Sequence, residues 1–270
     1  MGITPSLLLI VPTLNSYKVL PRLIKSLKSQ IFEDWKLLFV DGPSNNDHKL
    51  YLYNCCKNDK RINYINQDIH YKGIYGAMNQ GLIHAKSSDW ILFWGSDDWA
   101  VSNKTFFNIM SLLNKYKKND YLNMPDIVIS RGIYVNALNG AKNRLSKFDE
   151  SKTFHNKREF CLSMLRGNSP PHQATLFGPS SRLRDPLYND RLTLTADLDF
   201  FIFLGIKKNL KVEIFKETIV NMEDAGISSR LFWLRIFEVI KTYFTHYKIF
   251  FIIPFIARYI KRLMSKNNLR

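Results

Sequence analysis

Acidic side chains stand at the ends of three short apolar segments, where a carboxylate can leave a core and face a ligand. Asp41 and Asp68 each follow one such segment, and the adjacent pair Asp97 and Asp98 follows the run at residues 91–94. Two neighbouring carboxylates repel each other, so the pair indicates a cationic partner. A hard divalent cation such as Mg²⁺ or Mn²⁺ fits, because one or two carboxylates often hold it and phosphate oxygens complete its shell.

The acid pair also has a structural interpretation. Ser96, Asp97 and Asp98 precede a segment with helical periodicity, and Ser and Asp are favoured at helix N-termini, where acids also interact well with the helix dipole. The presence of Asp41 and Asp68 at equivalent positions favours a shared site over a helix cap.

The apolar segments that position these acids predict buried parallel strands. Each segment is short, continuous and closed by turn residues, and helical patterns separate them. Strands are expected at residues 7–13, 36–42, 61–68 and 89–98, and helices at residues 18–30, 75–86 and 103–118. Strands that alternate with helices imply βαβ units in an α/β fold, with a mostly parallel sheet covered on both faces.

The second half of the chain has a mixed pattern. Residues 126–148 predict two strands joined by an Asn-Gly turn, and residues 155–167 predict a helix. No internal repeat or low-complexity linker interrupts the chain before its basic tail. We expect one domain at residues 1–227, made of halves 1–120 and 121–227, and a tail at residues 228–270.

Ligands of open α/β sheets bind outside the carboxyl ends of the parallel strands, where the strand order reverses. Pro12, Thr13 and Asn15 follow the first predicted strand, and the acids follow the next three. We therefore expect a crevice that gathers several carboxylates in a chain of formal net charge +16. A nucleoside diphosphate bound with a divalent cation would suit such a crevice.

Six ordered motifs resemble the inverting family 2 glycosyltransferases of the GT-A fold. They are IVPTLN (10–15), VDGPSNND (40–47), GIYGAMNQG (73–81), WILFWGSDD (90–98), PHQATLF (171–177) and TADLDFFIFL (195–204). The resemblance implies a Rossmann-like GT-A domain, with a nucleotide-binding half at 1–120 and an acceptor-binding half at 121–227. It also implies metal-dependent transfer, with Mn²⁺ or Mg²⁺, from a nucleotide-diphosphate sugar to a saccharide hydroxyl, and UDP is the commoner nucleotide in the family.

The resemblance assigns roles position by position to the donor side of the crevice. Asp98 would be a metal ligand, and Asp97 would contact the ribose or the metal. The remaining positions implied to bind the nucleotide-sugar are Pro12, Thr13, Asn15, Asp41, Asp68 and Asn79.

Asp197 is the expected catalytic base. Inverting transfer needs a group that takes the proton of the acceptor hydroxyl, and the segment TADLD matches the family's catalytic segment, with Ala196 in place of the usual Glu. Capping of the following helix by Asp197, with Asp199 as a solvated acid of its first turn, is the structural alternative. His172 and Asp199 are candidates for contact with the acceptor or diphosphate, although a lone His is more often structural.

Two departures from the family pattern bear on the site. Gly76 stands where the subgroup usually has an Asp, so any contact of that acid is absent here. Residues 222–229 resemble the family's closing loop but contain no His, so water or phosphate would have to complete a metal shell.

The tail combines basic and apolar residues. Residues 228–270 contain nine basic side chains and one acid, Glu238, which gives this segment a net charge of +8. Its longest apolar run, residues 249–257, is far shorter than the roughly 20 residues that span a bilayer. This composition is typical of helices that lie on an anionic membrane surface, and packing on the domain or on a second subunit is the alternative.

A cytoplasmic location on the inner face of a membrane follows as an expectation. Three cysteines without metal-ligand spacing, Cys55, Cys56 and Cys161, indicate a reducing compartment, and the first residues lack an export signal. A membrane-bound enzyme suits an acceptor that is itself lipid-linked, such as a polyprenyl-diphosphate saccharide of a bacterial surface polysaccharide.

Two other classes of protein remain open at this point. A non-catalytic nucleotide or nucleic-acid binder would explain the basic charge, but strand-end acids repel a phosphate backbone, so nucleic acid is not the expected partner. A sugar-nucleotide pyrophosphorylase would be another nucleotide-handling α/β enzyme. Such enzymes usually carry a Gly-rich basic loop after the first strand, and residues 11–21 lack one.

Overall fold

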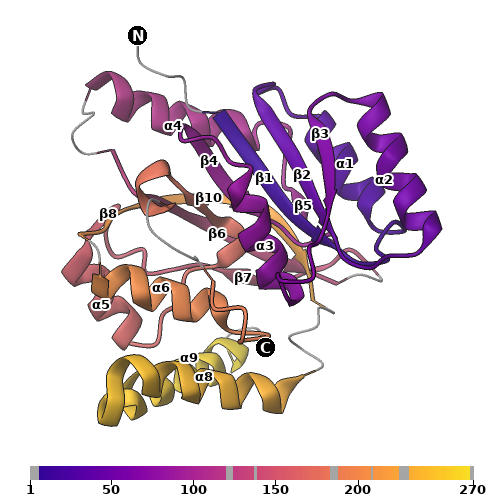
Figure 1. The fold of residues 1–270 in the computed structure, drawn as a ribbon. Helices are drawn as coiled ribbons and strands as arrows, with labels where there is room; N and C mark the ends of the chain where they lie inside the picture. Colours follow the sequence, from indigo (N-terminus) through magenta and orange to yellow (C-terminus); the bar gives the residue numbers. More distant parts are fainter. Residues whose placement is uncertain are drawn as a thin grey trace.

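A mixed sheet of ten strands organises the part of the chain that the computed structural model describes, which is residues 6–119, 124–136, 139–182, 188–207, 209–224 and 231–267. Helices cover both faces of this sheet, and a pair of C-terminal helices lies along one side of the molecule (Figure 1).

The first half of the chain forms four parallel strands, in the order β3-β2-β1-β4. Their bounds are β1 Ser6–Thr13, β2 Trp35–Asp41, β3 Ile62–Asn66 and β4 Asp89–Phe93. The β1–β2 register pairs Thr13 with Asp41, so both strands end at the same level. The predicted parallel sheet with flanking helices is confirmed, and its buried runs are those expected of strands covered on both faces.

The sheet continues beyond β4 with mixed pairing, in the order β9-β6-β10-β5, and of these strands all but β5 come from the second half of the chain. The bounds are β5 Trp99–Ala100, β6 Ile127–Val135, β7 Lys142–Ser146, β8 Phe154–Asn156, β9 Thr175–Phe177 and β10 Lys211–Glu223. The strand pair β6–β7 was predicted. β10 is the long element that the sequence analysis missed, and it pairs parallel with β6 and antiparallel with β5 and β8.

Two hydrophobic cores lie on the two faces of the sheet because alternate strand residues point to opposite sides. One core packs β1 and β2 against α1 Leu20–Lys28, α2 Asn46–Asn58 and α4 Thr105–Asn119. The other packs the sheet against α3 Gly73–Ile83, α5 Lys157–Leu165 and α6 Ala196–Lys207. Two short 3-10 helices, η2 His172–Ala174 and η3 Pro179–Arg182, flank β9.

The tail forms two helices, α8 Phe232–Tyr247 and α9 Ile252–Asn267, joined by the 3-10 turn η4 Lys248–Phe251. α8 lies against α6 and contributes Val239 and Tyr243 to the core (Figure 1). α9 passes so close to Gly167 that a Cβ there would lie 2.3 Å from the backbone nitrogen of Arg258. The predicted boundary between residues 227 and 228 falls outside the described residues. None of the described helices is both long and apolar enough to cross a bilayer.

Candidate active site

The carboxyl ends of the parallel strands meet along one edge of the sheet. β2 and β3 extend to one side of β1 and β4 lies on the other, so the strand order reverses next to β1. This is the place where ligands of open α/β sheets bind. Thr13, Asp41 and the pair Asp97–Asp98 follow or end these strands, as the sequence predicts.

Asp41 is fully buried and surrounded by donors. Its Oδ1 accepts hydrogen bonds from Thr13 Oγ1 at 3.0 Å and Ser44 Oγ at 2.7 Å, and His48 Nε2 lies 3.0 Å away. Burial lowers the pKa of His48 in spite of this carboxylate. The second oxygen, Oδ2, is buried without a hydrogen-bond partner among the described residues, which is unusual for a buried carboxylate oxygen.

A cavity of about 530 Å³ opens beside Asp41 and brings it together with Asp68. The volume lies within the range of small-molecule sites. Asp68 is exposed, and its position is fixed by its backbone N–H, which donates to Gln80 Oε1 at 2.9 Å. Lys49 and Lys72 also line the cavity, so a ligand there would meet two positive charges along with the two acids.

Asn15 shapes the loop that follows β2. It adopts a left-handed backbone conformation with φ +52°, which Asn tolerates better than most residues. Its Oδ1 accepts the backbone N–H of Asn45 at 2.8 Å, and its own N–H donates to Ser44 Oγ at 2.9 Å. Asn15 therefore positions Ser44 against Asp41, while Pro12 is only partly buried.

The acid pair lies in a tight turn after β4. Asp98 is buried, and its Oδ2 accepts the N–H of Gly95 at 2.6 Å. A Cβ at residue 95 would lie 2.7 Å from Asp97 Oδ1 and 3.2 Å from Asp98 Oδ2, so a larger residue there would displace the acid side chains. Burial and the neighbouring Asp97 raise the pKa of Asp98 well above its usual range, and burial raises the pKa of Asp97. A cation would relieve this unfavourable concentration of charge.

Arg22 and Glu223 stand beside the acid pair, and the sequence analysis missed both. The Arg22 guanidinium forms an ion pair with Glu223, donates to the backbone oxygen of Asp97 at 3.0 Å and stacks 3.6 Å from the Trp99 ring centre. Glu223 ends β10 in the stretch that resembles a closing loop, which is the one sequence signal that pointed to it. For Arg22 no such signal exists.

The donor set at this corner fits a divalent cation that shares its shell with a ligand. No group of three or more His, Cys, Asp or Glu side chains with metal-site geometry occurs in the described ranges. Asp97 and Asp98 alone would supply protein oxygens, which matches sites where phosphate and water complete the shell. Residues 225–229 of the predicted closing loop lie outside the described part of the chain.

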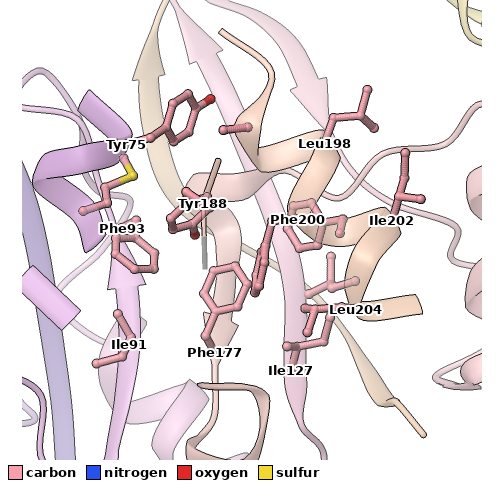
Figure 2. Packing of buried hydrophobic residues seen from close by; sticks show 14 of the residues in the cluster. Tyr75, Ile91, Phe93, Ile127, Phe177, Tyr188, Leu198, Phe200, Ile202 and Leu204 are labelled. Carbon is pink, nitrogen blue, oxygen red and sulfur yellow. The ribbon is translucent and has the colours of Figure 1, made fainter. Parts of the chain in front are cut away.

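Asp197 lies in the first turn of α6, and its carboxylate accepts a hydrogen bond from the hydroxyl of Tyr75 on α3. The distance from Tyr75 Oη to Asp197 Oδ1 is 3.3 Å. Burial and then the charge of Asp197 raise the pKa of Tyr75 well above its usual range, so this hydroxyl stays protonated and acts as a donor. Figure 2 shows Tyr75 close to Tyr188, and their ring centres are 5.5 Å apart. The side chain of Asp197 is partly exposed.

Tyr188 connects two of the predicted site residues, Asn79 and His172, to the core. Asn79 donates from Nδ2 to the backbone oxygen of Tyr188 at 2.9 Å and accepts its N–H at 3.1 Å, so this amide joins α3 to the segment before α6. His172 Nε2 lies 2.7 Å from the Tyr188 hydroxyl, and the imidazole stacks on Phe93. Burial lowers the pKa of His172 to about 4, so it carries no positive charge for a diphosphate at neutral pH.

Asp199 points towards the tail and not towards the strand edge. Its Oδ1 lies 2.7 Å from Nε2 of His246 on α8. His172 and Asp199 each have a partner within the fold, and the contact with His246 means that Asp199 is not the solvated acid of the alternative interpretation. Their contact with acceptor or diphosphate stays a prediction.

Gly76 is explained by a close approach of the loop before α3. A Cβ at this position would lie 2.5 Å from the carbonyl carbon of Tyr71, and backbone cannot move aside as a side-chain end can. Gln67 holds this loop by donating to the backbone oxygens of Tyr71 at 2.6 Å and Gly73 at 2.8 Å. The family's Asp therefore does not fit here, since the loop that lines the cavity occupies its place.

These features together define a GT-A-type domain. They are a parallel sheet with a strand-end acid pair, a buried acid on a nucleotide-sized cavity, and an acid at the start of α6. Residues 8–169 match the family described as glycosyl transferase family 2, which is more than half of the chain. The chain belongs to this family.

Relatives and solved structures agree with the family. A stretch of 98 residues, 36% of the chain, is 36% identical to a GalNAc(5)-diNAcBac-PP-undecaprenol β-1,3-glucosyltransferase of Campylobacter jejuni and spans 31% of that enzyme's length. S. aureus TarS, residues 1–349, superposes with a TM-score of 0.67 at 16% identity, over 97% of this chain and 73% of TarS. The mannosyltransferase PcManGT of Pyrobaculum calidifontis, solved with GDP-mannose and Mn²⁺, gives a TM-score of 0.56 at 12% identity, over 88% of this chain and 62% of that chain. The predicted GT-A fold is confirmed.

Replacing Gly76 by Ala is expected to destabilise the protein. Gly to Ala inside a helix normally stabilises by about 0.5–1 kcal/mol, but here the clash with the Tyr71 backbone should reverse the sign and cost about 1–3 kcal/mol. Urea unfolding measures the difference. Ile83→Ala, at an exposed position of the same helix, serves as the control and should change stability by less than about 0.5 kcal/mol. A higher urea midpoint for Gly76→Ala would contradict the model of this contact.

Acidification is expected to destabilise the protein through His172. The unfolded imidazole binds a proton below about pH 6.5, whereas the folded one stays neutral until about pH 4. The unfolded state therefore binds more protons in this window, and stability falls as the pH falls, by about 2 kcal/mol between about pH 7 and about pH 5. His172→Gln should remove this part of the loss in urea unfolding at the two pH values. An unchanged pH dependence would show that the buried imidazole is not responsible.

Proposed function

We propose that the protein is a metal-dependent inverting glycosyltransferase that moves a sugar from a UDP-sugar to a hydroxyl of a saccharide acceptor. The observation that carries this proposal is the buried Asp41, which has a carboxylate oxygen without a hydrogen-bond partner and belongs to the lining of a cavity of about 530 Å³ at the strand edge of a family 2 domain. This edge also carries the acid pair Asp97–Asp98.

The Asp41 cavity suits the nucleoside of the donor. A buried carboxylate oxygen that lacks a donor favours a ligand with an N–H, such as N3–H of uracil, over one that offers only acceptors. Asp68, Pro12, Thr13 and Asn15 surround or shape this region, and Lys49 and Lys72 compensate negative charge of the ligand. TarS, which shares the fold, has been solved with UDP and with UDP-GlcNAc.

Asp97 and Asp98 would hold Mn²⁺ or Mg²⁺. The bound cation would neutralise charge on the departing diphosphate. The chain itself brings the acids together on the Gly95 turn, and Arg22 fixes the backbone of Asp97 through its carbonyl oxygen. Arg22 also holds Glu223 near the pair, so β10 closes this corner of the site.

Asp197 would take the proton of the acceptor hydroxyl. The Tyr75 hydroxyl, which stays protonated, orients the carboxylate at 3.3 Å, and the partial exposure of Asp197 leaves it accessible to an acceptor. The Campylobacter relative is named for an undecaprenol-linked acceptor. A polyprenyl-diphosphate-linked saccharide of a surface glycan is accordingly the acceptor class that we propose.

Calorimetry with UDP, GDP, dTDP and CDP, each with and without Mn²⁺, tests the donor half of the proposal. We expect UDP to bind, and more tightly with Mn²⁺. Asp98→Asn should abolish the gain from Mn²⁺ and keep the metal-free affinity, whereas Asp41→Asn should weaken UDP under both conditions. Transfer from UDP-sugars to polyprenyl-diphosphate saccharides should fall about 10²- to 10⁴-fold in Asp197→Asn, with UDP affinity unchanged.

The controls and contrary outcomes separate the classes of function. Asp190, an exposed acid on the segment before α6, is the control, and Asp190→Asn should transfer much faster than Asp197→Asn. UDP binding without transfer by any UDP-sugar would favour a non-catalytic binder. No metal-dependent nucleotide binding would refute the proposal.

We also propose that the tail binds an anionic membrane surface from the cytoplasmic side. The outward faces of α8, η4 and α9 expose apolar side chains three or four residues apart, and Trp233, Ile249 and Phe250 are 79%, 77% and 64% exposed. Lys241, Lys248 and Lys261 are exposed between or beside them. The one acid of the tail, Glu238, is buried on the inner side, so the outer face carries positive charge alone among the side chains described there. This combination matches an interfacial surface.

Vesicle co-sedimentation tests this membrane surface. The full chain should bind vesicles that contain about a third phosphatidylglycerol and bind poorly to pure phosphatidylcholine, because each basic residue near an anionic surface adds about 1 kcal/mol. Lys241→Gln/Lys248→Gln should lower affinity roughly 30-fold. Trp233→Ser/Phe250→Ser should lower it strongly, and the exposed control pair Leu50→Ser/Ile83→Ser should not. Equal binding by all variants, or a stable dimer in solution without vesicle binding, would refute it.

A further inference from the structure

α8 presents an inward polar stripe that meets a single short segment of the chain. Glu238, Thr242 and His246 are spaced four residues apart and therefore share one helix face. All three contact residues 193–199, the segment that enters α6 and carries Asp197 in the first helical turn. The sequence analysis assigned no site role to this stripe.

Glu238 makes the strongest of these contacts. It is 5% exposed, and its two carboxylate oxygens accept the backbone N–H groups of Thr193 and Leu194, each at 2.8 Å. Oε2 also accepts from Thr195 Oγ1 at 3.2 Å. Hydrogen bonds to an ionised carboxylate are stronger than neutral ones, so three of them fix the entry to α6 firmly.

The neighbouring contacts act on the same few residues. Thr242 Oγ1 lies 3.4 Å from Thr195 Oγ1, and His246 Nε2 lies 2.7 Å from Asp199 Oδ1. Thr195 immediately precedes α6 and its carbonyl accepts the N–H of Asp199. The stripe therefore holds the backbone before Asp197 and the side chain of Asp199 after it, while Tyr75 contacts the side chain of Asp197 from α3.

Attachment of the tail does not by itself require this stripe. Val239 and Tyr243, fully buried in the core, already fasten α8 to the domain by apolar contact. A buried carboxylate adds a desolvation cost to that packing, and its three bonds all go to the three residues before α6. Hydrogen bonds placed in this way orient the segment before α6, whereas simple attachment of α8 to the domain would not need them.

We propose that Glu238 is a positioning residue for glycosyl transfer, which sets the orientation of Asp197 through the backbone of residues 193–195. The inference rests on the proposed role of Asp197 as base. It makes the basic tail a part of the active site: the outer face of α8 is available to a membrane, and the inner face of the same helix holds the catalytic segment. Deleting the tail would therefore remove the membrane-facing surface and the contacts to the catalytic segment together.

The test compares UDP affinity with turnover in full-length variants. Glu238→Gln keeps the shape of the side chain but replaces one acceptor oxygen by a donor amide that opposes an N–H. We expect kcat to fall about 10- to 100-fold for transfer from a UDP-sugar to polyprenyl-diphosphate saccharides, because small misplacements of a catalytic group cost that much. The Kd of UDP with Mn²⁺, measured by calorimetry, should not change, since the donor cavity lies on other elements.

A double variant shows whether Glu238 acts through Asp197. If it does, Asp197→Asn/Glu238→Gln should be no slower than Asp197→Asn alone, because the base that Glu238 positions is already missing. A general loss of folding would instead multiply the two effects. Thr245→Ala, on the exposed side of α8, is the control and should match the native kcat.

If Glu238→Gln does not fold, a second pair of variants tests whether the hydrogen bonds of Glu238 position Asp197. Thr195→Val removes one hydrogen bond to Glu238 and should lower kcat with the same unchanged Kd, whereas Thr195→Ser keeps the hydroxyl and should restore kcat. Native kcat in Glu238→Gln and Thr195→Val, or a parallel loss of UDP affinity, would overturn the inference while leaving the proposed function intact. Absence of UDP binding by the unmodified protein would overturn both.

Discussion

Burial of carboxylates among neutral donors is the interaction on which the site depends. Asp41 is held by two hydroxyls, Asp98 by the Gly95 N–H, and Glu238 by two backbone N–H groups and a hydroxyl. Neutral donors fix such a group in place but leave its charge uncompensated. A chain of net charge +16 thus keeps its basic side chains for outer surfaces and builds an anionic interior edge. At Asp41 and Asp98 that uncompensated charge can be used by a ligand or a cation.

The elements that carry this edge were predictable because their signals are local. Three of the first four strands, β1, β2 and β4, are short, largely buried runs, and strands covered on both faces must be continuously apolar. Once the runs are parallel, their carboxyl ends share an edge, which is why Asp41 and Asp68 could be placed on a common site from spacing alone. α2 escaped prediction because only His48 and Leu52 of its side chains are buried, so it has almost no apolar stripe to read.

The remaining parts of the site depend on contacts between distant segments. Arg22 and Glu223 are 201 positions apart and meet only because β10 returns to the sheet next to β5. The alternation within β10 gives no hint of that partner strand, and the bulges between residues 214 and 220 interrupt the pattern further. Gly76 is a second case in which a distant contact was needed. The sequence revealed that the family's acid is missing, but only the path of the Tyr71 loop explains why that acid does not fit.

The single acid of the tail, Glu238, shows how a local sequence signal and a contact between distant segments must be combined. Composition alone makes Glu238 look like an exception in a basic segment, and an exposed acid there would weaken attraction to an anionic surface by about as much as one basic residue adds. In the fold this acid lies on the inner face of α8, where its carboxylate accepts three hydrogen bonds within the domain, so it is separated from the outer face that carries the exposed lysines. The two faces of α8 consequently carry opposite chemistry, apolar and cationic outward, anionic inward. Because one helix bears both faces, the proposed contact with a membrane and the hydrogen bonds to residues 193–195 at the start of α6 depend on the same element.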